Sequence, residues 1–279
     1  RRTAVIGAIF IILIVIVAIF ADLMAPYDAY KYNFKEILEP PSKNHLLGTD
    51  DLGRDLLSRM MYGARTSMFI GFFASMAALI IGVFAGLFAG YYGGIIDSIL
   101  TTVCDVFLCI PSYFLYILVL AFFRVQNLYL MTCIIGVFMW PRLARIIRGE
   151  VLSLRERDFV KAATALGAGN IRIIFRHILP NCIAPVIVIS TLNIAIAILL
   201  EAALSFLGFG DPTIPSWGLQ LSRGRRDLRT AWWLSTFPGI AIFLATVSFN
   251  LVGDGLRDSL DPRLRGSTYA IQLKIMKVL

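Results

Sequence analysis

The sequence predicts an all-α membrane protein that crosses the bilayer several times, and composition and hydropathy patterning both point to it. Of the 279 residues, 58% are hydrophobic and only 16% are charged, whereas soluble domains carry about 25% charged residues. The apolar residues lie in long uninterrupted runs rather than in the alternating pattern of barrel strands. So few polar residues cannot cover one soluble core, which excludes an ordinary cytosolic enzyme, a disordered chain and a collagen-like chain.

Six apolar runs are long enough, or nearly so, to cross a bilayer as helices. Each run should be helical, because lipid cannot satisfy exposed backbone groups. The first follows Arg1 and Arg2, as a signal peptide would, but it is longer than a signal-peptide core and no small-residue cleavage site follows it, so we predict a retained helix. The predicted spans are residues 4–21, 68–92, 98–123, 125–141, 183–210 and 230–253.

The basic residues indicate the orientation of these spans. Lys and Arg number 26 against 18 Asp and Glu, a formal charge of +8. In a membrane protein such an excess marks the cytoplasmic segments. With both termini in the cytoplasm, 15 of the 26 basic residues lie inside, so we predict six spans with the N- and C-termini inside. Basic patches interleaved with aromatic residues are absent, so a nucleic-acid partner is not expected.

We divide the chain into three parts. Residues 1–67 hold the first span, an external loop and a segment in which Leu52, Leu56, Leu57 and Met60 recur at near-helical spacing. That spacing is typical of an amphipathic helix on the membrane surface, and a helix packed on the bundle is the alternative. Residues 68–266 form the core, with the other spans and a cytoplasmic loop at 148–181. The role of the tail, residues 267–279, is unassigned.

Small residues recur along the second predicted span at four-residue intervals. Residues four apart share one face of a helix, and small residues there let another helix approach closely in lipid. We favour packing against a helix of the same chain, and a helix of a partner chain is the alternative. The stripe consists of Ala74, Ala78, Gly82, Gly86 and Gly90.

The loop between the fourth and fifth spans predicts a cytoplasmic helix–turn–helix. Ser153 and Glu156 have capping-box spacing, and Gly167 is a typical helix stop. A second helix over 171–179 should end at Pro180. One apolar face suits docking to a cytoplasmic partner, and an interfacial helix pair is the alternative. The face consists of Phe159, Ala162, Ala163 and Leu166, flanked by Arg155, Arg157, Lys161 and Arg172.

Asp105 and Glu201 are the two ionisable residues well inside the predicted spans. Burying either charge costs a few kcal/mol, so each needs a partner or a water-filled path. We favour a structural role for Glu201. Asp105, six residues before a predicted kink at Pro111, is equally a candidate for the translocation path or for helix packing.

The remaining polar features point to no metal site. The four cysteines show no ligand spacing, and we expect them to be buried as small apolar residues. Two histidines are too few for a His-rich metal centre. In the loop after the fifth span, a group of arginines is a candidate for meeting an acidic extracytoplasmic protein, with lipid headgroups or solvent as the alternative. These are Arg223, Arg225, Arg226 and Arg229.

These motifs resemble those of the permease subunits of bacterial ABC importers. That family marks its cytoplasmic coupling loop with Glu-Ala-Ala, three residues, Gly, nine residues, Ile, one residue and Leu-Pro. Lys161 stands in place of the Glu and His177 in place of the Ile, while Ala162, Ala163, Gly167, Leu179 and Pro180 match in register. Further stretches resemble the C-type subunit of the dipeptide/oligopeptide permease group, namely 48–67, 89–94, 157–181, 201–210, 215–218 and 250–266.

The resemblance implies a heterodimer with a second permease subunit in the bacterial inner membrane. It further implies two cytoplasmic ABC ATPases, an extracytoplasmic substrate-binding protein and the import of di- or oligopeptides, with nickel chelates, glutathione or another small solute as alternative cargo. The sequence contains no GxxxxGK[ST] phosphate loop. We therefore expect no catalysis and no bound cofactor on this chain, with ATP and Mg held by the partner ATPases.

Two other classes of protein compete with this interpretation. An ion-coupled secondary transporter would need coupling-ion sites and usually repeated halves, and the sequence shows no internal repeat. An intramembrane hydrolase would need a nucleophile–base pair or a metal motif within the spans, and both His45 and His177 lie outside them.

Overall fold

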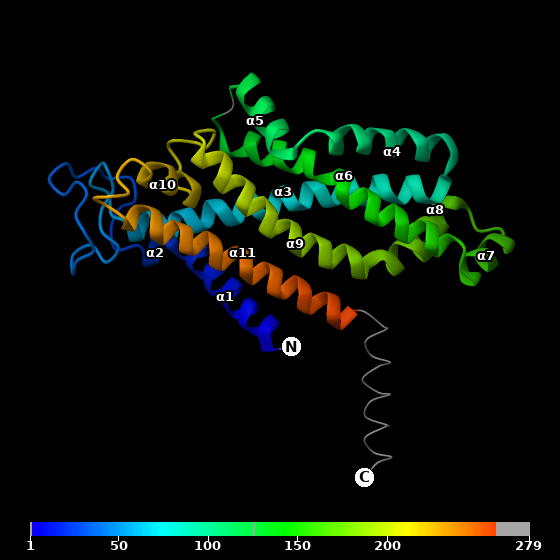
Figure 1. The fold of residues 1–279 in the computed structure, drawn as a ribbon. Helices are drawn as coiled ribbons and strands as arrows, with labels where there is room; N and C mark the ends of the chain where they lie inside the picture. Colours follow the sequence, from blue (N-terminus) through cyan, green and yellow to red (C-terminus); the bar gives the residue numbers. More distant parts are fainter. Residues whose placement is uncertain (1, 125, 261–279) are drawn as a thin grey trace, which may run out of the picture.

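Long helices lie side by side along the length of the molecule (Figure 1). The computed structural model describes residues 2–124 and 126–260. Within them, five helical segments are long and apolar enough to cross a membrane, and a bent pair, α4 (Gly94–Cys109) with α5 (Ser112–Phe122), makes a sixth if counted as one span. The predicted all-α polytopic class is therefore confirmed. The five are α1 (Arg2–Ile19), α3 (Leu56–Tyr92), α6 (Leu128–Arg155), the segment Asn170–Phe206 and α11 (Trp233–Leu260).

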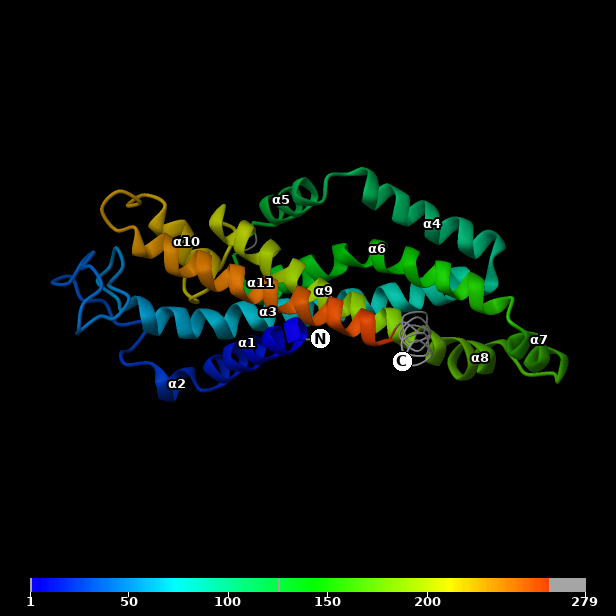
Figure 2. The same cartoon turned by 60° about the horizontal axis from the view of Figure 1, so that its bottom comes forward.

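Short helices gather at the two ends of the bundle. The segment Asn170–Phe206 consists of α8 (Asn170–Ile173), a π-helix η1 (Ile174–Ile178) and α9 (Leu179–Phe206). One end carries α7 (Asp158–Ala165) with α8, and the other carries the loop 25–55 with α10 (Trp217–Gly224), as Figures 1 and 2 show. The helix α2 (Ala21–Met24) follows α1.

Successive spans run in opposite directions. The first residues of α1 and the last of α11 therefore point toward the end that carries α7 (Figure 1), as six crossings with both termini on one side require. The predicted tail, residues 267–279, lies outside the described residues.

The helices α3 and α6 share the most extensive contact in the bundle. A Cβ added at Gly86 would lie 2.6 Å from the carbonyl oxygen of Ala144, and one at Gly90 would lie 2.7 Å from the Cβ of Val151. Gly82 similarly faces Leu143. Ala78 and Ala74, one and two turns before Gly82 in α3, are fully buried. The stripe of small residues thus packs within this chain, where only glycine leaves room for the backbone of α6.

Of the two interpretations of residues 52–60, the helix packed on the bundle is confirmed and the surface helix is wrong. Leu56 begins α3, and Asp55 caps it by accepting a hydrogen bond from the Ser58 N–H at 2.8 Å. Leu56 and Arg59 are both buried. The segment is the first turn of a long packed helix, since its apolar residues face the bundle rather than lipid.

The third predicted span is not one continuous helix. The axes of α4 and α5 differ by 86° across Ile110 and Pro111. Proline forces the preceding residue out of helical geometry, and Ile110 is extended, with φ −87° and ψ 130°. The kink was predicted at the right residue, but it is a full break.

The fourth span reaches further than the predicted end at residue 141. The helix continues through Pro141 to Arg155, so the first residues of the loop 148–181 are still part of α6. The predicted capping box is also wrong. Glu156 is the C-cap of α6, and Arg157 is the N-cap of α7 without a side-chain hydrogen bond. Apolar residues beyond Pro141, such as Ile147 and Val151, extend the helix because they pack against α3.

The second loop helix does not end at Pro180. After α8 the chain makes one π-helical turn and continues directly into α9. Pro180 lies in the first turn of α9, where its missing N–H and fixed φ are tolerated. The fifth span and the loop helix are thus one continuous rod.

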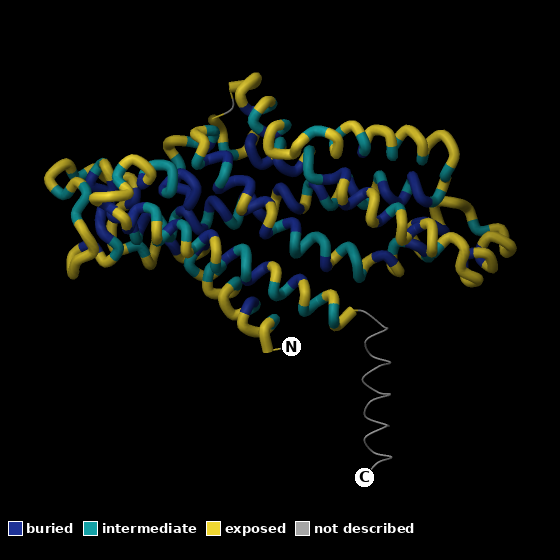
Figure 3. The backbone as a smooth tube through the Cα atoms, in the orientation of Figure 1, coloured by how far each residue is buried: buried dark blue, intermediate teal, exposed yellow. Residues whose placement is uncertain are grey.

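The outer surface of the bundle is rich in apolar side chains, as its partition into lipid requires. Exposed residues cover α1, α4 and α5, while α3, α6 and α9 form the buried centre (Figure 3). The expectation of four buried cysteines is half wrong, because Cys104 and Cys182 are buried but Cys109 and Cys133 are exposed on this outer surface.

Candidate functional site

The short helix α7 is fixed to the bundle by one of its faces. Val160 and Ala163 are buried in a cluster with Ile147 and Val151 of α6 and with Ile174 of η1. The same cluster includes Cys182 of α9, and Leu179 packs against it. A force applied to α7 therefore reaches two spanning helices through direct apolar contact.

The opposite face of α7 projects away from the molecule. Phe159 is 42% exposed and Leu166 is 88% exposed, and Lys161 and Ala162 are exposed beside them. The predicted single apolar face is thus divided, because Ala163 packs inward with Val160 while the other three residues point outward. Sequence reasoning missed Val160, although it lies three residues before Ala163 and so shares its face.

Gly167 ends α7 in a left-handed conformation, with φ +80°. The Ala168 N–H donates to the Ala163 carbonyl at 3.1 Å and the Gly167 N–H to the Thr164 carbonyl at 3.0 Å. This is the Schellman arrangement, in which glycine avoids the strain of a Cβ. The turn leaves the Leu166 side chain almost fully exposed.

An open groove of about 630 Å³ runs beside α7. Its walls include Tyr91 and Tyr92 from the end of α3, Arg155, Lys161 and Asn170. The Tyr91 hydroxyl donates to Asn170 Oδ1 at 3.0 Å, and Arg155 Nη1 donates to the Tyr91 carbonyl at 2.9 Å. These bonds connect the end of α3 to the last residue of α6 and the first residue of α8, which precede and follow α7 in the chain.

Glu201 lies in the centre of the bundle and is only 1% exposed. Its Oε2 accepts a hydrogen bond from Ser67 of α3 at 2.9 Å, and its Oε1 accepts one from Ser205 at 2.8 Å. Both carboxylate oxygens thus have hydroxyl donors, as a polar group buried among spans needs. The geometry is that of a clamp between α3 and α9.

Asp105 lies on α4 and forms an ion pair with Arg145 of α6. Both side chains are about half exposed. Eight residues earlier, Asp97 pairs with Arg148 of α6, a contact that sequence reasoning missed. Two acidic residues on one helix and two basic residues on its neighbour therefore hold α4 beside α6.

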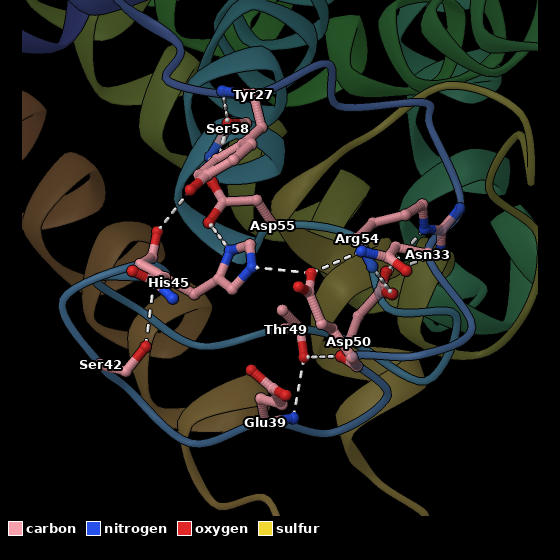
Figure 4. A network of polar contacts seen from close by, with 12 residues as sticks. Tyr27, Asn33, Glu39, Ser42, His45, Thr49, Asp50, Arg54, Asp55 and Ser58 are labelled. Atoms are coloured by element: carbon pink, nitrogen blue, oxygen red, sulfur yellow. Dashed lines mark hydrogen bonds and ion pairs between the residues drawn. The ribbon is translucent and has the colours of Figure 1, made fainter.

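A polar network closes the opposite end of the molecule. We call the loop 25–55 together with α10 the loop cap. The imidazole of His45 points at Asp55, with Nδ1 2.9 Å from Oδ1 (Figure 4). Its Nε2 lies 3.2 Å from Glu36 Oε2. The Tyr27 ring lies beside it, tilted by 35°, with the ring centroids 4.8 Å apart. Burial disfavours protonation of the ring, but the two carboxylates outweigh it and raise the pKa of His45 above its ordinary value.

This network predicts that the loop cap loosens as the pH rises. Only the doubly protonated imidazolium donates to both carboxylates, so its contribution is complete below the ordinary pKa of 6.5 and is lost as the pH passes the higher folded-state pKa. Amide hydrogen exchange in residues 25–55 should therefore speed up severalfold between pH 6 and pH 9, after correction for intrinsic rates. In His45→Gln this pH dependence should disappear. Equal pH dependence in both proteins would contradict the assignment.

The sequence is similar to membrane components of known transport systems. The family described as binding-protein-dependent transport system inner membrane component matches residues 82–266, and the N-terminal TM domain of oligopeptide transport permease C matches residues 1–41. The dipeptide transport system permease protein DppC of Alkalihalophilus pseudofirmus is 44% identical over 268 residues, covering 95% of this chain and 87% of the relative. The glutathione transport system permease protein GsiD of Escherichia coli O6:K15:H31 is 40% identical, covering 95% and 88%.

Proposed function

We propose that this chain, which belongs to the family of binding-protein-dependent transport system inner membrane components, forms half of the translocation path of an ATP-driven importer of short peptides. It is a multi-pass permease of the bacterial inner membrane. Its similarity to a dipeptide permease supports peptides as the cargo. The similarity to glutathione permeases supports a second candidate, glutathione, which is itself a short peptide.

The observation that carries the proposal is how α7 packs on the bundle. One face of this helix is locked to α6, η1 and α9, and the other presents Phe159 and Leu166 outward. An exposed apolar pair on a rigid base is suited to a cleft in another protein. A cytoplasmic ATPase is the partner that fits, with ATP and Mg bound by two such subunits and not by this chain.

Movement of α7 would pass directly into the spans. The rod from α8 to α9 includes one π-helical turn, a local irregularity that often marks functional sites in helices. Glu201 would carry the displacement of α9 to α3 through its bond to Ser67. Within this scheme the ATPase contact includes Arg157, Lys161 and Ala162. Leu179 and Pro180 connect η1 to α9. Asp105 positions α4 against α6.

The other partners follow from the same scheme. With α7 in the cytoplasm, the loop cap faces the exterior, where a substrate-binding protein would dock. A second permease subunit would complete the path, and the apolar side chains exposed on α4 and α5 give it a surface on which to pack. The remaining outer surface contacts lipid.

Reconstitution of the four-subunit complex into vesicles tests the proposal. Uptake of a labelled dipeptide should require ATP on the side of the ATPases and the binding protein on the other side, and ionophores should leave it unchanged. Uptake that persists without nucleotide and collapses with the proton gradient would show an ion-coupled transporter instead.

A further inference from the structure

Three guanidinium groups converge on one buried carboxylate in the loop cap. Asp50 is fully buried, and its Oδ2 lies 2.8 Å from Arg54 Nε, 3.5 Å from Arg59 Nε and 3.9 Å from Arg223 Nη1. Arg54 comes from the loop, Arg59 from the start of α3 and Arg223 from α10. Figure 4 shows the Asp50–Arg54 pair at the edge of the cap network. We call these four residues the arginine cluster.

The arginine cluster carries more positive than negative charge. Asp51 is the other carboxylate within reach, 3.9 Å from Arg223 Nη1, so two carboxylates face three guanidinium groups. Arg59 is only 1% exposed, yet among residues 2–124 and 126–260 no acceptor forms a hydrogen bond with its Nε or Nη2, or with Arg223 Nη1. Buried charged donors that make no hydrogen bond are costly even when a carboxylate lies nearby, so the cluster is suited to accepting one further anionic group.

The geometry favours a carboxylate as that group. The planar fork of arginine matches a carboxylate bidentately. The cluster opens on the side of Arg223, which is 18% exposed, and Asp51, which is 41% exposed. Burial and the neighbouring charge of Asp50 raise the pKa of Asp51. Asp51 also lies 3.8 Å from Arg54 and 3.9 Å from Arg223, beyond hydrogen-bond distance of both, so it is the carboxylate beside the cluster that an incoming carboxylate would displace.

We propose that Arg59 and Arg223 form a site for the free carboxylate of a small molecule that arrives at the loop cap. The identity of that molecule rests on the proposed function, because peptides and glutathione both end in a free carboxylate. The guanidinium groups of the cluster would bind the carboxylate of such a cargo at the extracytoplasmic entrance of the translocation path. Because Arg59 Nε, Arg59 Nη2 and Arg223 Nη1 are each enclosed, an incoming carboxylate reaches them by taking the place of the Asp51 side chain.

The site can be tested in the purified complex by thermal unfolding, without nucleotide and at constant ionic strength. Acetate and dialanine should raise the unfolding midpoint in a saturable way, since a ligand that binds only the folded state stabilises it. Acetamide and dialanine amide, which lack the negative charge, should not. In Arg223→Gln the half-saturating acetate concentration should rise at least about tenfold, as expected for loss of a charged hydrogen bond.

Two control variants separate this role from general effects on folding. Arg226→Gln removes an exposed positive charge three residues further on and should bind acetate normally. Arg223→Lys keeps the charge without the fork and should recover part of the binding. A midpoint shift that is equal in Arg223→Gln and the unaltered protein, or a shift with acetamide, would overturn the site.

A third outcome would also overturn the small-molecule site: the substrate-binding protein raises the midpoint, acetate does not, and the rise is lost in Arg223→Gln. That result would assign Arg223 to docking of the binding protein. Because binding is measured without ATP, the result is independent of the uptake test. A complex that binds acetate but takes up no peptide would contradict only the proposed function.

Discussion

Gly86→Ala is expected to destabilise the bundle by about 1–3 kcal/mol, the usual cost of inserting a methyl group into a packed core. The added Cβ would lie 2.6 Å from the Ala144 carbonyl oxygen and 2.8 Å from the Ile147 Cβ. The first of these is a backbone atom, so the two helices must move apart. The stability of the purified complex, measured as its thermal unfolding midpoint, should fall accordingly.

Gly149→Ala provides the matched control for this substitution. Gly149 lies on the exposed side of α6, and a Cβ there meets no atom within 4 Å. Alanine is the better helix former by about 1 kcal/mol, so this variant should be as stable as the unaltered protein or more so. Equal stability of the two variants would show that the close approach of α3 and α6 does not depend on the glycine stripe.

Phe159→Asp is expected to leave the chain inserted and assembled but to reduce ATP-driven uptake at least about tenfold. A carboxylate placed in an apolar cleft loses its hydration, which costs well over the 1.4 kcal/mol that corresponds to a factor of ten. Phe159 is partly exposed and lies outside the buried cluster that holds α7, so the fold should survive. The measurement is peptide taken up per ATP hydrolysed in vesicles.

Phe159→Leu keeps an apolar side chain at the same position and should retain most of the coupling. Gly167→Pro tests the turn itself, since proline cannot adopt the φ of +80° that the chain has there. It should uncouple hydrolysis from uptake in the same way. Normal coupling in both Phe159→Asp and Gly167→Pro would remove α7 from the mechanism.

The features that sequence alone predicted are those encoded by local periodicity. The four-residue repeat of small side chains identified the packed face of α3, and continuous apolar runs located five crossings and the bent pair α4–α5. Where prediction failed, packing had overridden local signals. Ser153 and Glu156 match a capping box, yet α6 continues past Ser153 because Val151 is buried against neighbouring helices. Likewise Pro180 does not end a helix, because it lies in the first turn of α9.

Contacts between residues distant in sequence could not be predicted in this way. The bond from Ser67 to Glu201 joins residues 134 positions apart, and nothing local marks them as partners. The arginine cluster is similar, since Arg223 and Asp50 meet only because α10 folds over the loop 25–55. The Asp97–Arg148 pair likewise depends on how α4 packs along α6.

The central claim is that α7 is the cytoplasmic contact through which a separate ATPase drives this chain. Cysteine placed at Leu166, in a background with the four native cysteines replaced by alanine, tests it directly in intact cells and in inverted vesicles. The residue should react with a membrane-impermeant maleimide only in inverted vesicles, and it should cross-link to the ATPase subunit, while a Lys31→Cys control should react only from outside. Labelling of position 166 from the exterior, or a complex that takes up peptide without any ATPase subunit, would contradict the claim.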